Sequence, residues 1–306
     1  MNFNKLKIIK HRRVFFIFSG TLIVLSLLSL SILGLHFSID FTGGSLLEIS
    51  IQTEHQLTAP DITDKIKTAL PELNDILVQP TSNGFIIRTK DLTEDEHQQV
   101  LNVLKNNLGN KEIIEKRFES IGPVVGQELK NKAVWAVGIA IIMMIVYIAW
   151  AFRKVSKPVA SWKYSIGAII ALAHDLLIVI GIFSVLGHFL PNYEIDLLFV
   201  TAMLTILGYS INDTIVVYDR ARENLIYNPQ VTFEDTINKS INETMTRSIN
   251  TGVATLFVLI ALYFLGGESV QNFVLVLFIG IVFGTYSSIF IASPLLVVWQ
   301  KMSGKK

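Results

Sequence analysis

The chain of 306 residues contains no cysteine and comparatively few charged residues. Without cysteine it can form no disulfide, no thiol-based catalytic site and no thiolate metal site. Charged residues make up only 17% of the sequence, whereas hydrophobic residues make up 51% and the mean hydropathy is +0.51. This balance fits soluble folds poorly and predicts a protein with several membrane spans.

Common catalytic motifs are also absent from the sequence. It contains no Gly-x-x-x-x-Gly-Lys-Ser/Thr nucleotide loop, no His-Glu-x-x-His metal pair and no Gly-x-Ser-x-Gly nucleophile turn. We therefore expect no enzyme activity, no cofactor or metal and no nucleic-acid partner. Any energy for the function of the chain has to come from another source.

Six apolar runs are each long enough to cross the roughly 30 Å hydrocarbon core as a helix of about 20 residues. They cover residues 14–35, 134–152, 165–186, 197–217, 249–265 and 273–299. Helices are the expected form, because an isolated segment in lipid must satisfy its own backbone groups. The first run follows a basic start but is long for a signal peptide and lacks a small-x-small cleavage site, so we interpret it as a retained anchor.

The positions of Lys and Arg predict the orientation of these spans. Basic residues precede the first run, follow the sixth, and lie between the second and third and between the fourth and fifth. The short connections 187–194 and 266–272 contain none. Because basic loops stay on the cytoplasmic side, we predict a multi-pass membrane protein with both termini in the cytoplasm.

This topology places residues 37–132 on the periplasmic side as a single insertion between the first two spans. Their pattern predicts strands at 45–51, 75–78, 85–89 and 112–119 and helices at 60–70 and 94–107. Thr93 with Glu96 forms a capping-box signature, and Asn83-Gly84 is a hairpin signal. The β-α-β-β-α-β order is that of a ferredoxin-like unit.

The fold class we predict is therefore a polytopic α-helical membrane protein, with six transmembrane helices and one periplasmic α+β ferredoxin-like domain between helices 1 and 2. Its expected parts are residues 1–36, with the first span, the domain and linker 37–132, and residues 133–306, with the remaining spans.

Residues 218–246 contain a helical pattern of their own. Apolar side chains recur every four residues at Phe233, Ile237, Ile241 and Met245. This period predicts either an amphipathic helix at the membrane interface or a helix docked on neighbouring loops.

Asp213 is the most informative residue, because it places a carboxylate inside the apolar run 197–217. An ionisable group in the hydrocarbon core costs at least about 2.5 to 3.5 kcal/mol, so it is seldom kept for packing alone. On a helix, a small and polar stripe lies within about 60° beside Asp213 and Tyr209. The stripe consists of Thr201, Thr205, Gly208 and Asn212. We expect it to face a bundle interior, where Thr, Gly and Asn also serve as contacts between helices.

Asp175 lies near the middle of the third run, directly after His174. Carboxylate and imidazole can both take up and release protons, which suggests a relay. Adjacent helical residues point about 100° apart, so the two side chains need not touch. The alternative is that each one hydrogen-bonds a neighbouring helix.

Arg247 is a candidate counter-charge for Asp213. A fifth helix of about 20 residues that ends at Gly266 has Arg247 at its cytoplasmic end. Since the fourth and fifth spans are antiparallel, Asp213 and Arg247 are expected at similar depth, where an ion pair would hold the carboxylate ionised. The alternative is an arginine that extends to the membrane edge.

Small residues also line the sixth run, at Gly280, Gly284, Ser288 and Ala292. This spacing lets another helix approach closely, and packing is the favoured interpretation.

Four motifs together resemble the SecF family of bacterial protein-export membrane subunits. They are Asp40-Phe41-Thr42-Gly43-Gly44, Ile121-Gly122-Pro123-Val124-Val125-Gly126, the stretch from Gly208-Tyr209-Ser210-Ile211-Asn212-Asp213-Thr214 to Arg220, and Phe283-Gly284-Thr285-Tyr286-Ser287-Ser288. The resemblance covers essentially the whole chain in motif order. Ser38 departs from it, because the family usually has Gly before this Ile-Asp-Phe-Thr-Gly-Gly run.

The resemblance implies an accessory subunit of the bacterial inner membrane that pairs with SecD beside the SecYEG channel, with YajC as a further partner. It also implies an unfolded preprotein as substrate and a pseudo-symmetric fold of the resistance-nodulation-division superfamily, of which this chain supplies one six-helix half. In the family, the carboxylate of the Asn-Asp-Thr motif and the arginine that opens the fifth span are linked to proton passage, which implies roles for Asp213 and Arg247. Asp175 matches a His-Asp pair of the family, and Asp40, Gly43 and Gly44 match its periplasmic motif.

The resulting hypothesis is a protonation switch within the lipid bilayer. Protons from outside neutralise Asp213, its pair with Arg247 loosens, the helices shift and the outer domain moves. Two other functions stay open at this point, namely half of a proton-driven small-molecule efflux transporter and a purely structural subunit.

Overall fold

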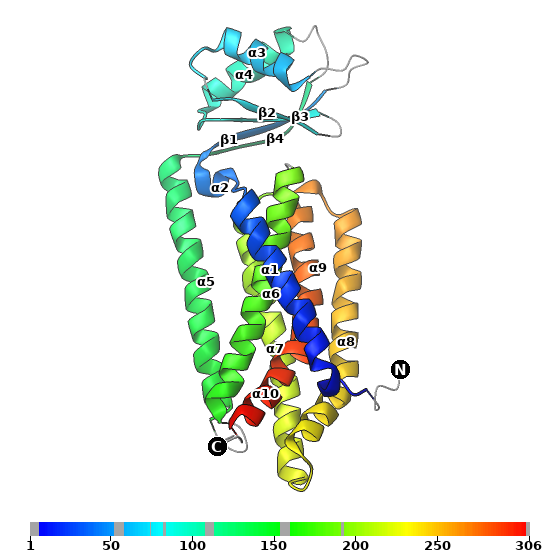
Figure 1. Ribbon diagram of the computed structural model, residues 1–306. Helices are drawn as coiled ribbons and strands as arrows, with labels where there is room; N and C mark the ends of the chain where they lie inside the picture. Colours follow the sequence, from blue (N-terminus) through cyan, green and yellow to red (C-terminus); the bar gives the residue numbers. More distant parts are fainter. Residues whose placement is uncertain are drawn as a thin grey trace. The chain divides into compact units, whose positions relative to one another are not determined.

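The computed structural model describes residues 6–51, 58–73, 75–81, 84–107, 113–153, 160–190 and 193–303. The chain forms two compact units, a helical unit of Met1–His36 with Trp135–Lys306 and an α/β unit of Phe37–Val134 (Figure 1). Asn83 of the predicted hairpin lies outside the described residues, as do several of the basic residues that predicted the topology. These basic residues are Lys5, Lys154, Lys157, Lys305 and Lys306.

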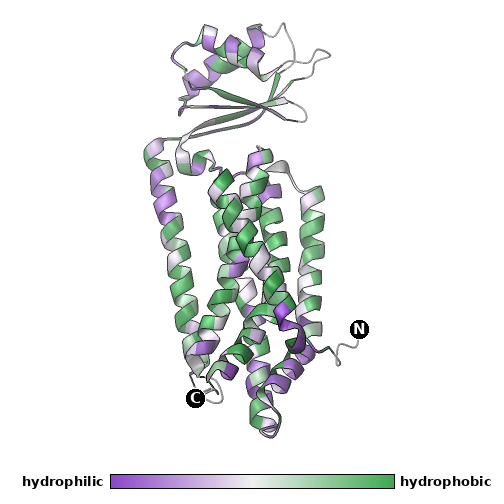
Figure 2. Cartoon of the chain, viewed as in Figure 1, coloured by the Kyte–Doolittle hydropathy of each residue, from purple (hydrophilic) through white to green (hydrophobic). Residues whose placement is uncertain are grey.

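Six helices of the described chain are long and apolar enough to cross a membrane. The spans are α1 (Arg12–Leu33), extended by the short η1 (Ile9–His11), then α5 (Pro123–Ala151), α6 (Ser161–Phe189), α7 (Leu197–Tyr227), α8 (Phe233–Leu265) and α9 (Glu268–Ser287). The last span continues through a π-helical turn, η2 (Ser288–Ala292), into α10 (Ser293–Ser303). Figure 2 shows hydrophobic residues along most of the length of these helices.

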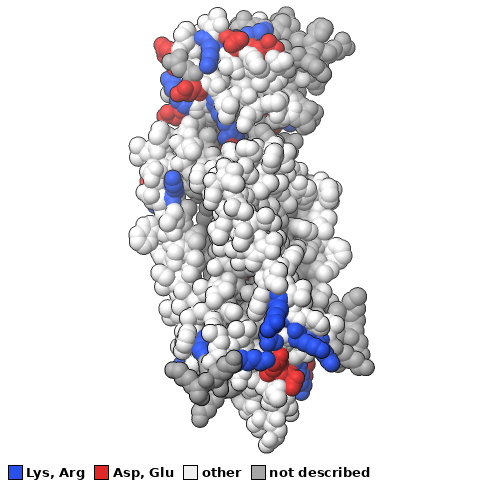
Figure 3. Space-filling view, viewed as in Figure 1, with Lys and Arg blue, Asp and Glu red and all other residues white. Residues whose placement is uncertain are grey.

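Charged residues of the helical unit gather at one end, where α1 begins and α10 ends (Figure 3). Glu234, at the start of α8, accepts a hydrogen bond from Arg12 of α1 at 2.9 Å and forms an ion pair with Lys301 of α10. Backbone atoms of the N-terminal segment also bind α8, since Asn238 and Asn242 both donate to the carbonyl oxygen of Leu6 at 2.9 Å. Three segments far apart in sequence are therefore joined at this end.

Helix α8 differs from the prediction because it begins at Phe233 instead of at residue 249. The hydroxyl of Thr232 caps it by accepting from the backbone N–H of Asp235 at 3.2 Å. The residues of the four-residue period are buried in the core of the helical unit, with at most 7% exposure. They are Phe233, Ile237, Ile241 and Met245. Neither interpretation is found as stated, because this segment is the first part of one continuous helix and packs on other helices instead of on loops.

The row of small residues on the last span brings α9 close to α7, as predicted. A Cβ atom on Gly280 would overlap the side chain of Ile206, and one on Gly284 would lie 3.0 Å from Cβ of Ser210. Larger side chains at these two positions would push α7 away. This close contact determines where the polar residues of α7 lie.

The α/β unit contains a four-stranded antiparallel sheet in the order β2-β3-β1-β4. Its elements are β1 (Gly44–Ile51), α3 (Ala59–Ala69), β2 (Leu77–Thr81), β3 (Gly84–Thr89), α4 (Glu94–Asn107) and β4 (Ile113–Ile121), preceded by the short α2 (Ile39–Thr42). Helices α3 and α4 cover one face of the sheet (Figure 1). The order and the pairing are those of a ferredoxin-like fold. With the six spans, they confirm the predicted fold class.

Helices α3 and α4 both begin with a capping box, which explains why they start where they do. In α4, Thr93 donates its backbone N–H and its hydroxyl to Glu96 at 2.8 and 2.9 Å, and its hydroxyl oxygen accepts from the N–H of Glu96 at 3.4 Å. These bonds, the backbone one first, hold the pKa of the Glu96 carboxyl below its ordinary value. Thr58 and Asp61 form the same arrangement at α3.

The two glycines between α2 and β1 adopt conformations that other residues avoid. Gly43 has φ +73° and ψ 174°, and Gly44 has φ +110°. The space around them is also restricted, because a Cβ on Gly43 would lie 2.8 Å from Cα of Pro123 and one on Gly44 would lie 2.7 Å from the carbonyl oxygen of Thr89. Gly126 packs against the same turn, because a Cβ atom on Gly126 would lie 2.9 Å from the backbone nitrogen of Gly43. The glycine pair joins the start of the sheet to the start of α5.

Replacing Gly43 by alanine should destabilise this junction. Backbone in this region costs a residue other than glycine about 1 to 3 kcal/mol, and the contact with Pro123 adds to that cost. We expect faster hydrogen–deuterium exchange in β1 and β4 of the full-length Gly43→Ala chain. Gly122→Ala is the matched control, since its φ is not in the left-handed region and its Cβ would meet nothing within 4 Å. Equal exchange in the two variants would contradict this account of the glycine pair.

Candidate functional site

Asp175 joins three membrane helices through hydrogen bonds. It lies on α6 and has no exposed surface. Its Oδ2 atom accepts from the hydroxyl of Ser210 on α7 at 2.6 Å and from that of Ser287 on α9 at 2.8 Å. Because hydrocarbon offers no donors, these protein hydroxyls are what makes a carboxyl group tolerable at this position. The approach of Ser210 in turn depends on the lack of a side chain at Gly284.

His174 contacts Asp175 directly, with 2.9 Å between Nδ1 and Oδ1. Its ring also lies nearly parallel to the ring of Tyr286, with 6.1 Å between the centroids. Within the described chain, Nε2 of His174 has no hydrogen-bond partner, although the residue is 98% buried. Side chains of adjacent helical residues point about 100° apart, yet His174 and Asp175 are in contact. The imidazole and the carboxyl group can therefore share a proton.

Asp213 lies at a second junction, where α7 meets α8 and α9. It is 6% exposed, and its Oδ1 atom accepts from the hydroxyl of Ser248 on α8 at 3.1 Å. Its Oδ2 atom is buried without a hydrogen-bond partner among the described residues. Asp175 has both oxygens engaged, whereas Asp213 keeps one available.

Two further polar atoms beside Asp213 also lack a partner in the described part of the chain. They are the hydroxyl of Tyr209, one turn earlier on α7, and that of Thr285 on α9. Thr285 lies close enough to both Asp213 and Tyr209 to interact with them, although no hydrogen bond of good geometry forms between these side chains. Gly252 of α8 keeps the space open, because a Cβ there would lie 3.2 Å from Oγ1 of Thr285 and 3.5 Å from the Tyr209 hydroxyl. Such buried hydroxyl groups can hydrogen-bond a water molecule, and the neighbouring carboxylate of Asp213 can take up a proton.

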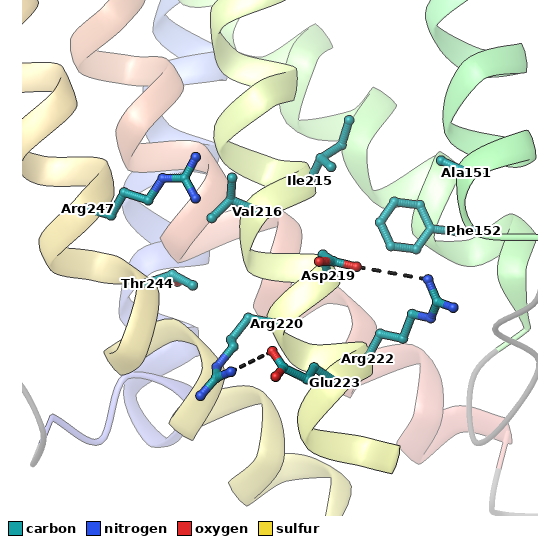
Figure 4. Close-up of a pocket in the computed structure, with 10 residues that line it drawn as sticks. All are labelled: Ala151, Phe152, Ile215, Val216, Asp219, Arg220, Arg222, Glu223, Thr244 and Arg247. Carbon is teal, nitrogen blue, oxygen red and sulfur yellow. Dashed lines mark hydrogen bonds and ion pairs between the residues drawn. The ribbon is translucent and has the colours of Figure 1, made fainter. Parts of the chain in front are cut away.

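Arg247 acts on Asp213 electrostatically but forms no ion pair with it within 4.0 Å, as far as the structure describes the chain. The physical reason is the helix geometry of α8. Successive residues point about 100° apart, so Ser248 faces Asp213 while Arg247 is turned to one side. Arg247 lines a cavity with residues of α7 (Figure 4). In this structure Asp213 therefore contacts Ser248 instead of forming the expected ion pair with Arg247.

The predicted stripe on α7 does not face the interior of this chain, and that expectation is wrong. Its four residues are exposed. They are Thr201, Thr205, Gly208 and Asn212. The opposite side of α7 is buried and includes Ile206, Ser210 and Val217. Membrane helices turn polar and small residues toward protein, and the sequence of one chain cannot tell whether that protein is the same chain or another.

The remaining motif residues lie in a different unit. Asp40 belongs to α2, and Gly43 and Gly44 form the turn into β1, so all three are part of the α/β unit. The sequence analysis assigned no role to the hydroxyl groups of Ser210, Ser248, Thr285 and Ser287, although they surround the two carboxylates. Three of them lie inside quoted motifs, and the fourth directly follows Arg247.

Two family models match the sequence. The one described as protein export membrane protein SecD/SecF, C-terminal, matches residues 99–302. The SecD/SecF GG motif matches residues 28–54, which include Asp40, Gly43 and Gly44.

Curated relatives and a solved structure agree with these matches. Protein translocase subunit SecF of Thermobaculum terrenum is 41% identical, over 96% of this chain and 93% of that protein. The protein of the same name from Anaerolinea thermophila is 39% identical, over 96% of this chain and 94% of that protein. The crystal structure of SecDF, a translocon-associated membrane protein from Thermus thermophilus, matches with a TM-score of 0.81 and 30% identity. The match covers 96% of this chain and 38% of that chain.

Removing either serine that binds Asp175 should destabilise the helical unit. A buried acceptor that loses one donor costs about 1 to 3 kcal/mol, so Ser287→Ala should lower the thermal unfolding midpoint of the purified protein. Ser288→Ala is a matched control, because that buried hydroxyl donates to the carbonyl oxygen of Thr285 in the same span and to no other helix among the described residues. If both variants unfold at the same temperature, Asp175 does not hold the helices together as described.

Proposed function

This chain belongs to the SecF family of protein translocase subunits, multi-pass proteins of the inner membrane, and we propose that it couples proton movement to a late stage of preprotein export. In this proposal it works with SecD beside the SecYEG channel, with YajC as a further partner and unfolded preproteins as substrate. The observation that carries the proton coupling is the environment of Asp213. A buried carboxyl with one available oxygen, beside two unpaired hydroxyls, is suited to exchanging a proton.

The proposed cycle begins when a proton reaches Asp213. Neutralising the carboxylate removes the charge on which Arg247 acts and weakens the hydrogen bond from Ser248. Contacts between α7 and α8 then change, while α7 stays joined to α6 and α9 through Asp175. Each proton contributes about 2.3 kcal/mol per 100 mV of membrane potential, which is enough to shift a two-state equilibrium substantially.

Asp175 and His174 complete the proposed relay at Ser210, which lies one turn before Asp213 on the buried side of α7. The carboxyl of Asp175 has no free oxygen, so a proton would enter this pair through the unpaired Nε2 atom of His174. Asp175 thus has a double task in the proposal, since it joins three helices and shares a proton with His174.

The exposed stripe on α7 supports association with a second six-helix half. The matched SecDF chain is more than twice as long as the part that aligns with this chain. Small and polar residues let two helices approach closely and give each other hydrogen-bond partners within the membrane. We propose that the stripe, defined by Thr201, Thr205, Gly208 and Asn212, is the contact with SecD.

The proposed orientation places both termini and the charged end of the helical unit in the cytoplasm, and the α/β unit in the periplasm. The distribution of Lys and Arg supports it, because the connections at the opposite ends of the helices, 187–194 and 266–272, contain neither residue. Protons would then enter from the side of the α/β unit and leave toward the cytoplasm.

Replacing Asp213 by asparagine tests the proton coupling. Asn keeps the size of the side chain but cannot change charge, so we expect Asp213→Asn to abolish the proton-dependent part of preprotein export in membrane vesicles, while the protein still co-purifies with SecD. Glu128→Gln is the control, because this exposed carboxylate pairs with Lys132 on its own helix, with no other ion pair among the described residues, and should be dispensable. Normal proton-dependent export by Asp213→Asn would refute the proposal.

The docking role of the stripe has its own test. Gly208 has no atom within 4 Å of the position of a Cβ, so Gly208→Leu should fold normally as a single chain but should reduce co-purification with SecD severalfold. Gly20→Leu on α1 is the matched control, since that glycine is equally free of neighbours within its chain. Equal recovery of SecD with both variants would place the contact elsewhere.

A further inference from the structure

A cavity of 340 Å³ opens on the helical unit between the end of α5, helix α7 and helix α8. Ligand-binding pockets are typically of about this size or larger. One part of its wall is apolar and the other is charged. The apolar residues are Ala151, Phe152, Ile215 and Val216; the polar ones are Asp219, Arg220, Arg222, Glu223, Thr244 and Arg247.

The three arginines of the cavity differ in how firmly they are paired. Arg220 is bound by Glu223 at 2.5 Å and by Glu243 at 2.7 Å, so its charge is compensated. Arg222 reaches Asp219 only at 4.0 Å. Arg247 has no ion pair within that distance in the described part of the chain, and its side chain extends from α8 toward Val216 (Figure 4). Asp219, Glu223 and Glu243 balance the three arginines in number, and Arg247 is the arginine that has no ion pair in the described part of the chain.

The cavity also spans the boundary between apolar and charged parts of α7. Ile215 and Val216 belong to the apolar run that ends at residue 217, and the charged residues begin at Asp219. This boundary marks the depth at which phosphate groups of a bilayer lie. A ligand suited to the site therefore has an anionic phosphate joined to an apolar part, and basic pockets between membrane helices bind lipid headgroups of this kind.

We propose that this cavity binds the headgroup of an anionic glycerophospholipid. The phosphate is bound by the guanidinium group of Arg247, and the first carbons of the acyl chains extend along the cavity over Val216, Ile215 and Phe152 toward Arg222. A glycerophospholipid is favoured over a free phosphate ion because the apolar wall would stay unfilled by an ion. Binding of the lipid does not depend on proton movement through Asp213, so the two proposals can fail separately.

Native mass spectrometry of the purified complex with SecD tests this site. After delipidation, the complex is titrated with phosphatidylglycerol and, in parallel, with zwitterionic phosphatidylcholine. We expect preferential binding of phosphatidylglycerol, a loss of about tenfold or more in affinity in Arg247→Gln, and a smaller loss in Arg222→Gln, because only the first variant removes the charge-assisted hydrogen bond to the phosphate. Arg13→Gln is the matched control, because this exposed arginine on α1 does not line the cavity.

Several results would overturn the proposal. One is equal binding of the two lipids, and another is an equal effect of Arg13→Gln and Arg247→Gln. If inorganic phosphate displaces phosphatidylglycerol at equal concentration, the site selects a free anion. If the chain alone binds the lipid but the complex does not, a segment of SecD occupies the cavity. Arg222 is exposed enough for its variant to fold even where Arg247→Gln fails, since 36% of its side chain is accessible.

Discussion

A carboxyl group in the middle of a membrane must find its hydrogen-bond donors within the protein, and Asp175 illustrates what this demands of the fold. Its two serine donors come from α7 and α9, so three helices have to meet at one point. Gly280 and Gly284 allow that meeting, because any side chain there would separate α9 from α7. Once α7 is held in this way, its buried side is determined. Asp213 is turned toward α8, and the stripe of small and polar residues is turned outward.

The two membrane carboxyls differ in how far their hydrogen bonding is satisfied. Asp175 has partners for both oxygens and contributes to the cohesion of the bundle, whereas Asp213 has one oxygen without a partner in the described chain. Satisfied polar networks make a structure rigid, and a partly satisfied one leaves room for a change of state. The mobile step of the proposed cycle therefore belongs to the contact between α7 and α8, where a single serine hydroxyl joins the helices at Asp213.

Much of the fold could be predicted from local sequence, because the signals are local. Apolar runs predict the spans, and capping boxes mark where α3 and α4 begin. The helix α8 was the exception. Its first half, from Phe233 to Met245, has charged and polar residues on one side, which predicts a separate helix. No proline or glycine interrupts the chain before Gly252, so the backbone hydrogen bonds of the helix continue into the span. The apolar residues of that half pack into the helical core, which hydropathy along the chain does not report.

The sequence by itself determined the fold class, the family, and the identity of Asp213, Asp175 and Arg247 as charged residues within or at the edge of membrane spans. These follow from composition, periodicity and motif order, which are properties of neighbouring residues. Only the tertiary structure decided which groups surround the carboxyls, that Ser248 rather than Arg247 contacts Asp213, and that the stripe on α7 is exposed. Those facts depend on the rotation of each helix about its axis, and that rotation is determined by contacts between residues far apart in the chain.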